Sequence, residues 1–117
     1  MVARFAATGR ISMSGFDQRE REFEARFKHD QELRFKVTAR RNRLLGLWAA
    51  QKMGLAGEAA ETYAKSVVDA EFAGGDPRVI EKLVADLAAK GQTVTAAQVK
   101  FELDHLAERA KKALMSE

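Results

Sequence analysis

Apolar residues recur at three- and four-residue spacing along most of the chain, which is the pattern of one face of an α-helix. Broad apolar faces of this kind are carried by four stretches, at residues 44–53, 60–72, 79–87 and 99–114. The connections between them are only a few residues long, and short connections make neighbouring helices pack antiparallel. The pattern therefore predicts an all-α fold, a four-helix bundle in which residues 44–115 supply the four helical segments.

The boundaries of these segments carry residues that cap or end helices. Asp76 followed by Pro77 predicts the start of the third segment, because proline in the first turn has no N–H to leave unpaired. Thr95 with Gln98 forms the pattern of a capping box that opens the fourth segment. Glycines, which accept the left-handed geometry that ends helices, follow each of the first three segments: Gly54 and Gly57, Gly74 and Gly75, and Gly91.

The first helix is predicted to be long. Asp17 can cap its free N–H groups, with Glu20 three residues later, and no proline interrupts the chain before Met53. A helix over residues 17–53 would extend about 55 Å at 1.5 Å per residue. Its first part is densely charged with only a thin apolar stripe, so we expect residues 1–16 to be a disordered N-terminal extension, 17–36 a protruding, charged helical arm and 37–117 the bundle domain.

The thin stripe of the arm is aromatic. Phe16, Phe23 and Phe27 are spaced seven and four residues apart, which places them along one side of a helix. The stripe either folds back on the bundle as ordinary core or fills a groove on a partner. Its charged flanks leave little apolar width for burial within the chain, which favours a helix-in-groove ligand. The predicted partner-binding residues are Phe16, Asp17, Arg19, Glu20, Arg21, Phe23 and Phe27.

Charge is spread unevenly along the chain. Residues 1–46 hold 11 Lys or Arg against 6 Asp or Glu, whereas the remainder is net acidic, although the whole chain is at +3. The basic half is therefore the expected binding half. With no Cys, the chain has no disulfide and no thiolate metal site, and no apolar run has the length of a membrane span.

Catalytic chemistry has little support in the sequence. His29 and His105 are the only imidazoles, and neither has the neighbours of a triad or a metal site. The basic cluster Arg40, Arg41 and Arg43 has two interpretations, a solvated helix face or a phosphate site that holds ADP or ATP as a regulatory ligand. No helix-turn-helix unit accompanies it, so nucleic acid is not an expected partner. We predict that the chain is not an enzyme and has no obligatory cofactor.

Three motifs give the chain a resemblance to a known family. They are F-D-x-R-E at residues 16–20, K-H-D-x-E-L at 28–33 and A-R-R-N-R-L-L-G-L-W-A-A at 39–50. With these motifs the sequence after Met13 resembles the zeta subunit of alphaproteobacterial F-type ATP synthases, a small four-helix inhibitor. The resemblance implies that residues 13–31 insert as a helix between the alpha and beta catalytic subunits, next to the gamma rotor, and block rotation in the direction of ATP hydrolysis.

The same resemblance implies a location and a set of partners. The chain is expected to be a cytoplasmic protein, peripheral on the inner membrane through ATP synthase, without inserting into the membrane itself, and a monomer when free. Residues 1–12 are expected to be an extended start, with Met13 as the natural first residue. If residues 1–12 stay attached, the chain departs from the family pattern, because the inhibitory arm then does not begin at a free chain end. The alternative functions are an ADP- or ATP-binding helical sensor and a general helical adaptor with an unrelated partner.

Overall fold

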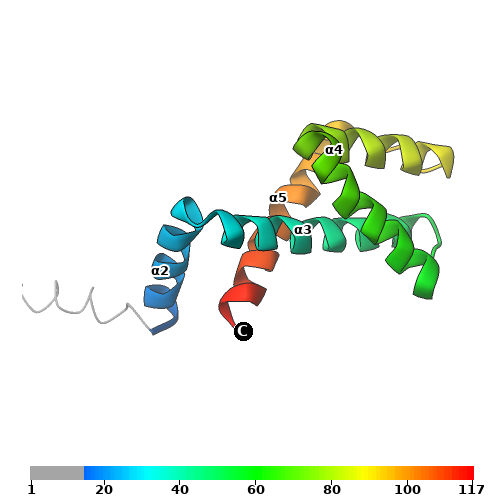
Figure 1. Ribbon diagram of the computed structural model, residues 1–117. Coiled ribbons are helices and arrows are strands. Elements are labelled where there is room, and N and C mark those ends of the chain that lie inside the picture. Colours follow the sequence, from blue (N-terminus) through cyan, green and yellow to red (C-terminus); the bar gives the residue numbers. More distant parts are fainter. Residues whose placement is uncertain (1–14) are drawn as a thin grey trace, which may run out of the picture.

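The structure, a computed structural model, describes residues 15–117, and within this range the chain forms helices without strands (Figure 1). The elements are α2 (Gly15–His29), α3 (Gln31–Lys52), α4 (Gly57–Ala89) and α5 (Ala96–Met115). The predicted all-α fold of four packed helices is confirmed. Most of the predicted N-terminal extension lies outside the described residues, and its last two residues, Gly15 and Phe16, already belong to α2.

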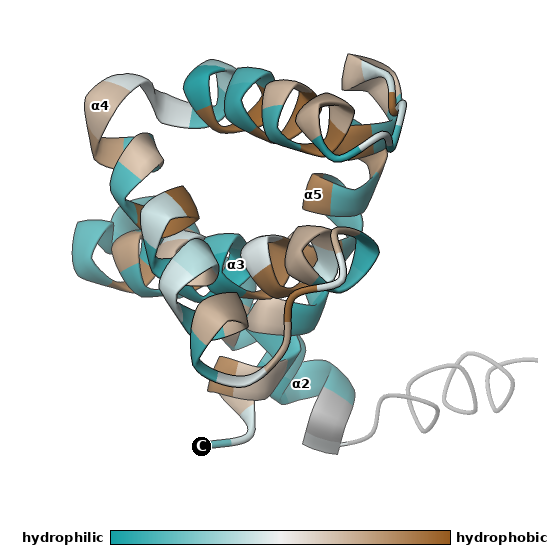
Figure 2. Cartoon of the chain, turned by 90° about the vertical axis from the view of Figure 1, so that its right-hand side faces the viewer, coloured by the Kyte–Doolittle hydropathy of each residue, from teal (hydrophilic) through white to brown (hydrophobic). Residues whose placement is uncertain are grey.

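The bundle core lies where α3, α4 and α5 meet, and in Figure 2 the apolar faces of these helices turn toward one another. Gly46 of α3 permits a close approach to α4, because a Cβ atom there would lie 2.5 Å from the Cα atom of Ala64. Such packing excludes water from the larger apolar side chains. The bundle core consists of Leu45, Ala49, Val67, Ala70, Val79, Leu83, Leu87, Val99, Leu103 and Leu106.

Helix α4 is bent where the sequence predicts a connection. Gly74 and Gly75 have non-helical backbone angles, and the positive φ of 71° at Gly75 is a conformation that favours glycine. Pro77 lies just after the bend, where a second helical stretch begins. The predicted second and third helices are therefore the two halves of one bent helix, α4.

The predicted caps of the other helix ends are present. Gly54 has a φ of 80° directly after α3, and the N–H of Leu55 donates to the carbonyl of Ala50 at 2.9 Å. Thr95 and Gln98 form the predicted capping box, with reciprocal side-chain hydrogen bonds of 2.8 and 3.0 Å. These caps fix the positions at which α3 ends and α5 begins.

The prediction of one continuous first helix over residues 17–53 is wrong. The chain breaks at Asp30, whose φ of −101° and ψ of 103° are extended and whose side chain accepts a hydrogen bond from the N–H of Leu33 at 3.1 Å. Asp30 therefore caps a second helix where Asp17 was expected to cap a single one, and Asp17 lies inside the first turn of α2. The break turns α2 away from the axis of α3 and toward the end of α5 (Figure 1).

Candidate functional site

The aromatic stripe of the arm is in part buried against the bundle. Phe23 is only 7% exposed and packs with Leu33 and Val37 of α3 and Ala110 of α5. These four residues, here called the arm cluster, form a small core separate from the bundle core. The expectation that the arm aromatics have no partners within the chain is wrong for Phe23, because the break at Asp30 allows α2 to fold back, which a straight helix would not.

Phe27 sits at the edge of the arm cluster and is half-buried. The ammonium of Lys111, on α5, lies 4.3 Å from the centre of its ring, a distance at which a cation is attracted to an aromatic face. The same ammonium lies 3.2 Å from a carboxylate oxygen of Glu24 on α2. One α5 lysine therefore contacts two arm residues one helical turn apart.

The charged residues predicted for partner binding lie along the same helix. Arg19 and Arg21 are exposed, whereas Asp17 and Glu20 are half-buried. Asp17 and Arg21 each take part in further interactions. Phe16 belongs to the first turn of α2, and its side chain lies outside the described part of the structure.

The base of the arm is held by polar contacts across the break. The N–H of Asp30 donates to the carbonyl of Arg26 at 2.7 Å, and the guanidinium of Arg34 donates to the carbonyl of Lys28 at 3.1 Å. The contacts satisfy backbone groups that the end of α2 would otherwise leave free. They hold the break in one geometry.

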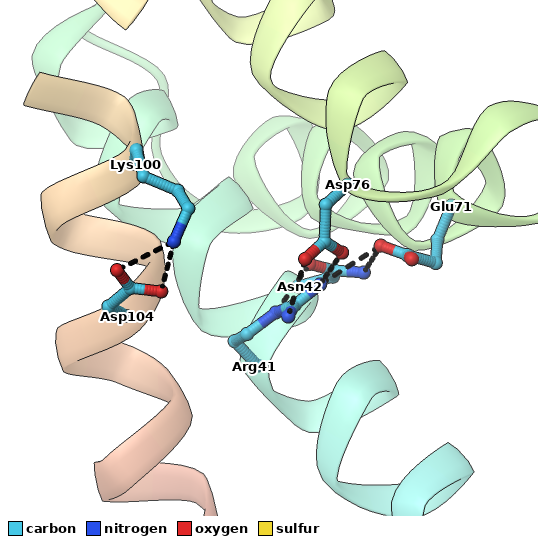
Figure 3. Close-up of polar contacts among 6 residues, drawn as sticks. All are labelled: Arg41, Asn42, Glu71, Asp76, Lys100 and Asp104. Atoms are coloured by element: carbon cyan, nitrogen blue, oxygen red, sulfur yellow. Dashed lines mark hydrogen bonds and ion pairs between the residues drawn. The ribbon is translucent and has the colours of Figure 1, made fainter. Parts of the chain in front are cut away.

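Arg41, one of the three candidate phosphate ligands, lies in a buried polar network (Figure 3). Its Nη2 atom donates to Glu71 Oε1 at 3.0 Å and to Asp76 Oδ1 at 2.7 Å. Asn42 donates to the same oxygen of Glu71 at 2.8 Å, and its own Oδ1 accepts from Nε of Arg41 at 3.1 Å. The network joins α3 to both sides of the bend in α4, so it orients the bundle.

The environment of the network shifts the pKa values of its two carboxyl groups in opposite directions. Burial raises the pKa of Glu71 above its ordinary value, and the neighbouring Asp76 adds to this, although Asn42 and Arg41 oppose it. Burial by itself would also raise the pKa of Asp76, but the hydrogen bonds and charge of Arg41 outweigh it and the pKa is lowered. Lys100 of α5, bound to Asp104 beside the network in Figure 3, lowers the pKa of Asp76 further.

The other two arginines of the basic cluster are paired at the surface. Arg40 lies 2.7 Å from a carboxylate oxygen of Glu117, and Arg43 binds both oxygens of Glu61, at 2.8 and 2.9 Å. Neither pair is buried, so a competing anion would displace an ordinary surface ion pair. Binding of ADP or ATP at Arg40, Arg41 and Arg43 stays a prediction. Arg41, the buried residue of the three, already has two carboxylate partners, Glu71 and Asp76.

Two features of the site were missed by the sequence interpretation. Helical spacing gives Lys111 no particular role, because its contact with Phe27 depends on a fold-back that the spacing does not encode. Asn42 carried a usable signal in the sequence, since it lies three residues before Leu45 and seven before Ala49, on the apolar face of the helix. A polar residue on an inward face requires hydrogen-bonding partners, which points to residues such as Glu71.

The fold is that of a small all-α protein in which a helical bundle carries a short N-terminal helix, α2, on a separate apolar cluster. Within residues 15–117 there is no group of three or more potential metal ligands, and none of the helices is long and apolar enough to cross a membrane.

The family described as ATPase inhibitor subunit zeta matches residues 13–113, and the chain belongs to this family. Membership implies regulatory inhibition of the F-type ATP synthase and interaction with that assembly, and it places the chain among inhibitor subunits, not catalytic enzymes. No curated protein matches the sequence.

Proposed function

We propose that the chain blocks ATP hydrolysis by inserting its N-terminal arm between an alpha and a beta catalytic subunit, next to the gamma rotor. The observation that carries this proposal is the family match, which covers the arm together with the bundle. The arm is residues 17–36, with residues 1–16 as an extension before it and 37–117 as the bundle domain. Because the chain breaks at Asp30, the part that moves is α2, and the first turns of α3 form its base.

The arm offers the partner an aromatic stripe with charged flanks. Phe16, Phe23 and Phe27 would enter the groove between the catalytic subunits, while Asp17, Arg19, Glu20 and Arg21 would pair with charges at its rim. Three buried Phe side chains are worth roughly 5 to 9 kcal/mol before the costs of binding. Nanomolar affinity requires about 12 kcal/mol. The stripe alone is therefore too weak, and other contacts must contribute.

The fold of the unbound chain further lowers the free energy that the aromatic stripe can contribute to binding. Phe23 is already buried in the arm cluster, so its transfer to a partner removes little new apolar surface from water. Helix α2 must also leave Leu33, Val37, Ala110 and the ammonium of Lys111 before it can insert. The arm cluster therefore competes with the catalytic head for the same side chain.

The proposed setting follows from the partner. The chain would act as a monomer, bound on the cytoplasmic side of the inner membrane through ATP synthase. Each catalytic head would be blocked by one inserted arm, because one arm is enough to stop a rotor that serves all catalytic sites.

The test is ATP hydrolysis by the cognate catalytic head with the purified chain added. The full chain should inhibit, and a version without residues 1–28 should not, although its bundle should remain helical by circular dichroism. A version that begins at Met13 should inhibit at least as well as the full chain. Equal inhibition with and without residues 1–28 would show that the arm is not the inhibitory element.

A further inference from the structure

Two phenylalanines lie exposed side by side on the face shared by α3 and α4. Phe35 is 55% exposed and Phe72 is 67% exposed, and their ring centres are 5.4 Å apart. A single exposed apolar residue is ordinary, whereas a contiguous apolar patch on a protein surface marks an interaction site more often than chance. The pair lies on the opposite side of α3 from Leu33 and Val37, so the arm cluster does not cover it.

Two depressions meet at Phe35. One has a volume of about 410 Å³, runs between Gln31, Arg34 and Phe72, and is mainly apolar. The other, about 940 Å³, continues toward Leu44 and the end of α5. Phe35, Ala39 and Val68 line both, so the two depressions form one continuous surface. We call it the aromatic groove.

The rim of the aromatic groove is mostly positive. Its cationic residues are Arg34, Lys36, Arg40, Arg43 and Arg109. Two acids also line it: Glu71 is turned to the buried network, and Glu117 is paired with Arg40. Lys36 and Arg43 have exposed pairs with Glu32 and Glu61, which a carboxylate of a partner can replace. Arg109 has no ion pair among residues 15–117. The groove is therefore complementary to a ligand with apolar and acidic side chains.

The aromatic groove begins at the base of the arm. Gln31 and Arg34, which line it, are in the first turn of α3, directly after the break at Asp30. A partner that holds α2 would therefore lie within a short distance of the groove. A second contact made through so short a tether is effectively intramolecular and raises affinity without a new encounter.

We propose that the aromatic groove binds an acidic amphipathic helix on the outer surface of the catalytic head, as a second contact beside the inserted arm. Apolar side chains of that helix would cover Phe35 and Phe72, and its carboxylates would face Lys36 and Arg109, which is a recognised way for a helix to bind a groove. This inference rests on the proposed function and supplies the additional contact that the aromatic stripe of the arm requires.

The main test compares affinities of full-length chains for the purified cognate catalytic head. Phe35→Ala combined with Phe72→Ala should weaken binding roughly 10- to 100-fold, since two large apolar contacts are removed. The matched control is Phe101→Ala, because Phe101 is 72% exposed and lines neither depression. The control should bind as the unchanged chain does, and circular dichroism should show that both variants are folded.

The charge of the partner is tested on α5. Arg109→Glu should slow association with the head and reduce its dependence on salt, because opposite charges steer the encounter. Lys112→Glu makes the same change of charge on the same helix, at a residue that lines neither depression. It should leave the association rate less affected than Arg109→Glu.

Three results would overturn the proposal. If the unchanged chain inhibits the head and the double phenylalanine variant binds it equally well, the groove is not a contact, although the proposed function stands. If sedimentation shows a dimer that the double variant abolishes, the groove binds a second copy of the chain. If the unchanged chain neither binds nor inhibits the head, this proposal and the proposed function fail together.

Discussion

The bundle core and the arm cluster are both apolar, but they differ in how much of the chain holds them. The bundle core joins three helices, and Leu45, Leu83 and Leu87 in it have no exposed surface. The arm cluster has four buried residues, and it is covered on one side only by α2, a helix of 15 residues. Because local opening costs the apolar contacts that it breaks, α2 should open while the bundle remains folded. The bundle is therefore the more permanent part of the fold, and α2 is the segment whose contacts should open first.

The largest expected effect on stability comes from truncating a side chain in the bundle core, and the matching truncation in the arm cluster should have only a local effect. Leu83→Ala should lower the free energy of unfolding by about 3 kcal/mol, because it leaves a cavity among fully buried side chains. Phe23→Ala should leave the bundle transition nearly unchanged and remove amide protection from α2 alone. Trp48, the only tryptophan, packs against the bundle core, so its fluorescence in denaturant reports the bundle. Equal loss in both variants would mean that the two cores unfold as one.

A smaller effect is expected at the polar network that orients the bundle. Arg41→Met should cost about 2 kcal/mol, less than for a fully buried pair because Asp76 remains partly exposed and hydrated. Two neighbouring carboxylates would lose the cation between them. The matched control is Arg43→Met, whose exposed pair with Glu61 should contribute less than about 1 kcal/mol. If both changes shift the Trp48 transition alike, the network is not a distinct support.

Substitution of Asp30 at the break should destabilise α2 and the first turn of α3 but not the bundle. Asp30→Ala removes the cap of α3 and should cost about 1 kcal/mol in the arm and the first turn of α3. Hydrogen exchange of α2 should speed up, with the bundle amides unaffected. Asp30→Asn keeps a capping side chain and should behave as the unchanged chain does. Faster exchange throughout the bundle would contradict the separation of the two regions.

The smallest expected effect is the response of the bundle to pH. Because the pKa of Asp76 is lowered in the fold, its contribution is present above the unfolded value of 3.8 and is lost as the pH falls through the folded value. Glu71 has a raised pKa, so its contribution is greatest below 4.5 and declines as the pH rises. Asp76→Asn should remove the first dependence and Glu71→Gln the second, in denaturant midpoints measured from pH 3 to 7. Unchanged profiles in both variants would show that the network does not titrate with folding.

The bundle was predictable because its signals are local. Apolar spacing located the helices, and Gly54, Thr95 and Gln98 marked ends that the structure contains. The arm was less predictable, since the contact of Phe23 with Ala110 joins residues far apart in the chain. Spacing shows that aromatic residues share a face of a helix, but it does not show what covers that face.

The buried state of Arg41 was missed for a related reason. Three arginines in a row of four residues have the same local pattern whether they face water or one of them is buried. Only the position of Glu71 and Asp76 on either side of the bend decides which arginine turns inward. The family resemblance, in contrast, depended on the order of residues in motifs and was confirmed by the family match.

The most direct test of the account is to fix α2 to α5 and measure inhibition. The chain has no cysteine, so Glu24→Cys with Lys111→Cys provides a single pair of thiols for a short, reducible crosslinker between the arm and the bundle. The control pair, Lys100→Cys with Asp104→Cys, places the same crosslink within α5. The crosslinked arm should not inhibit ATP hydrolysis by the catalytic head, reduction should restore inhibition, and the control should inhibit in both states. Full inhibition by the crosslinked arm would contradict insertion of the arm.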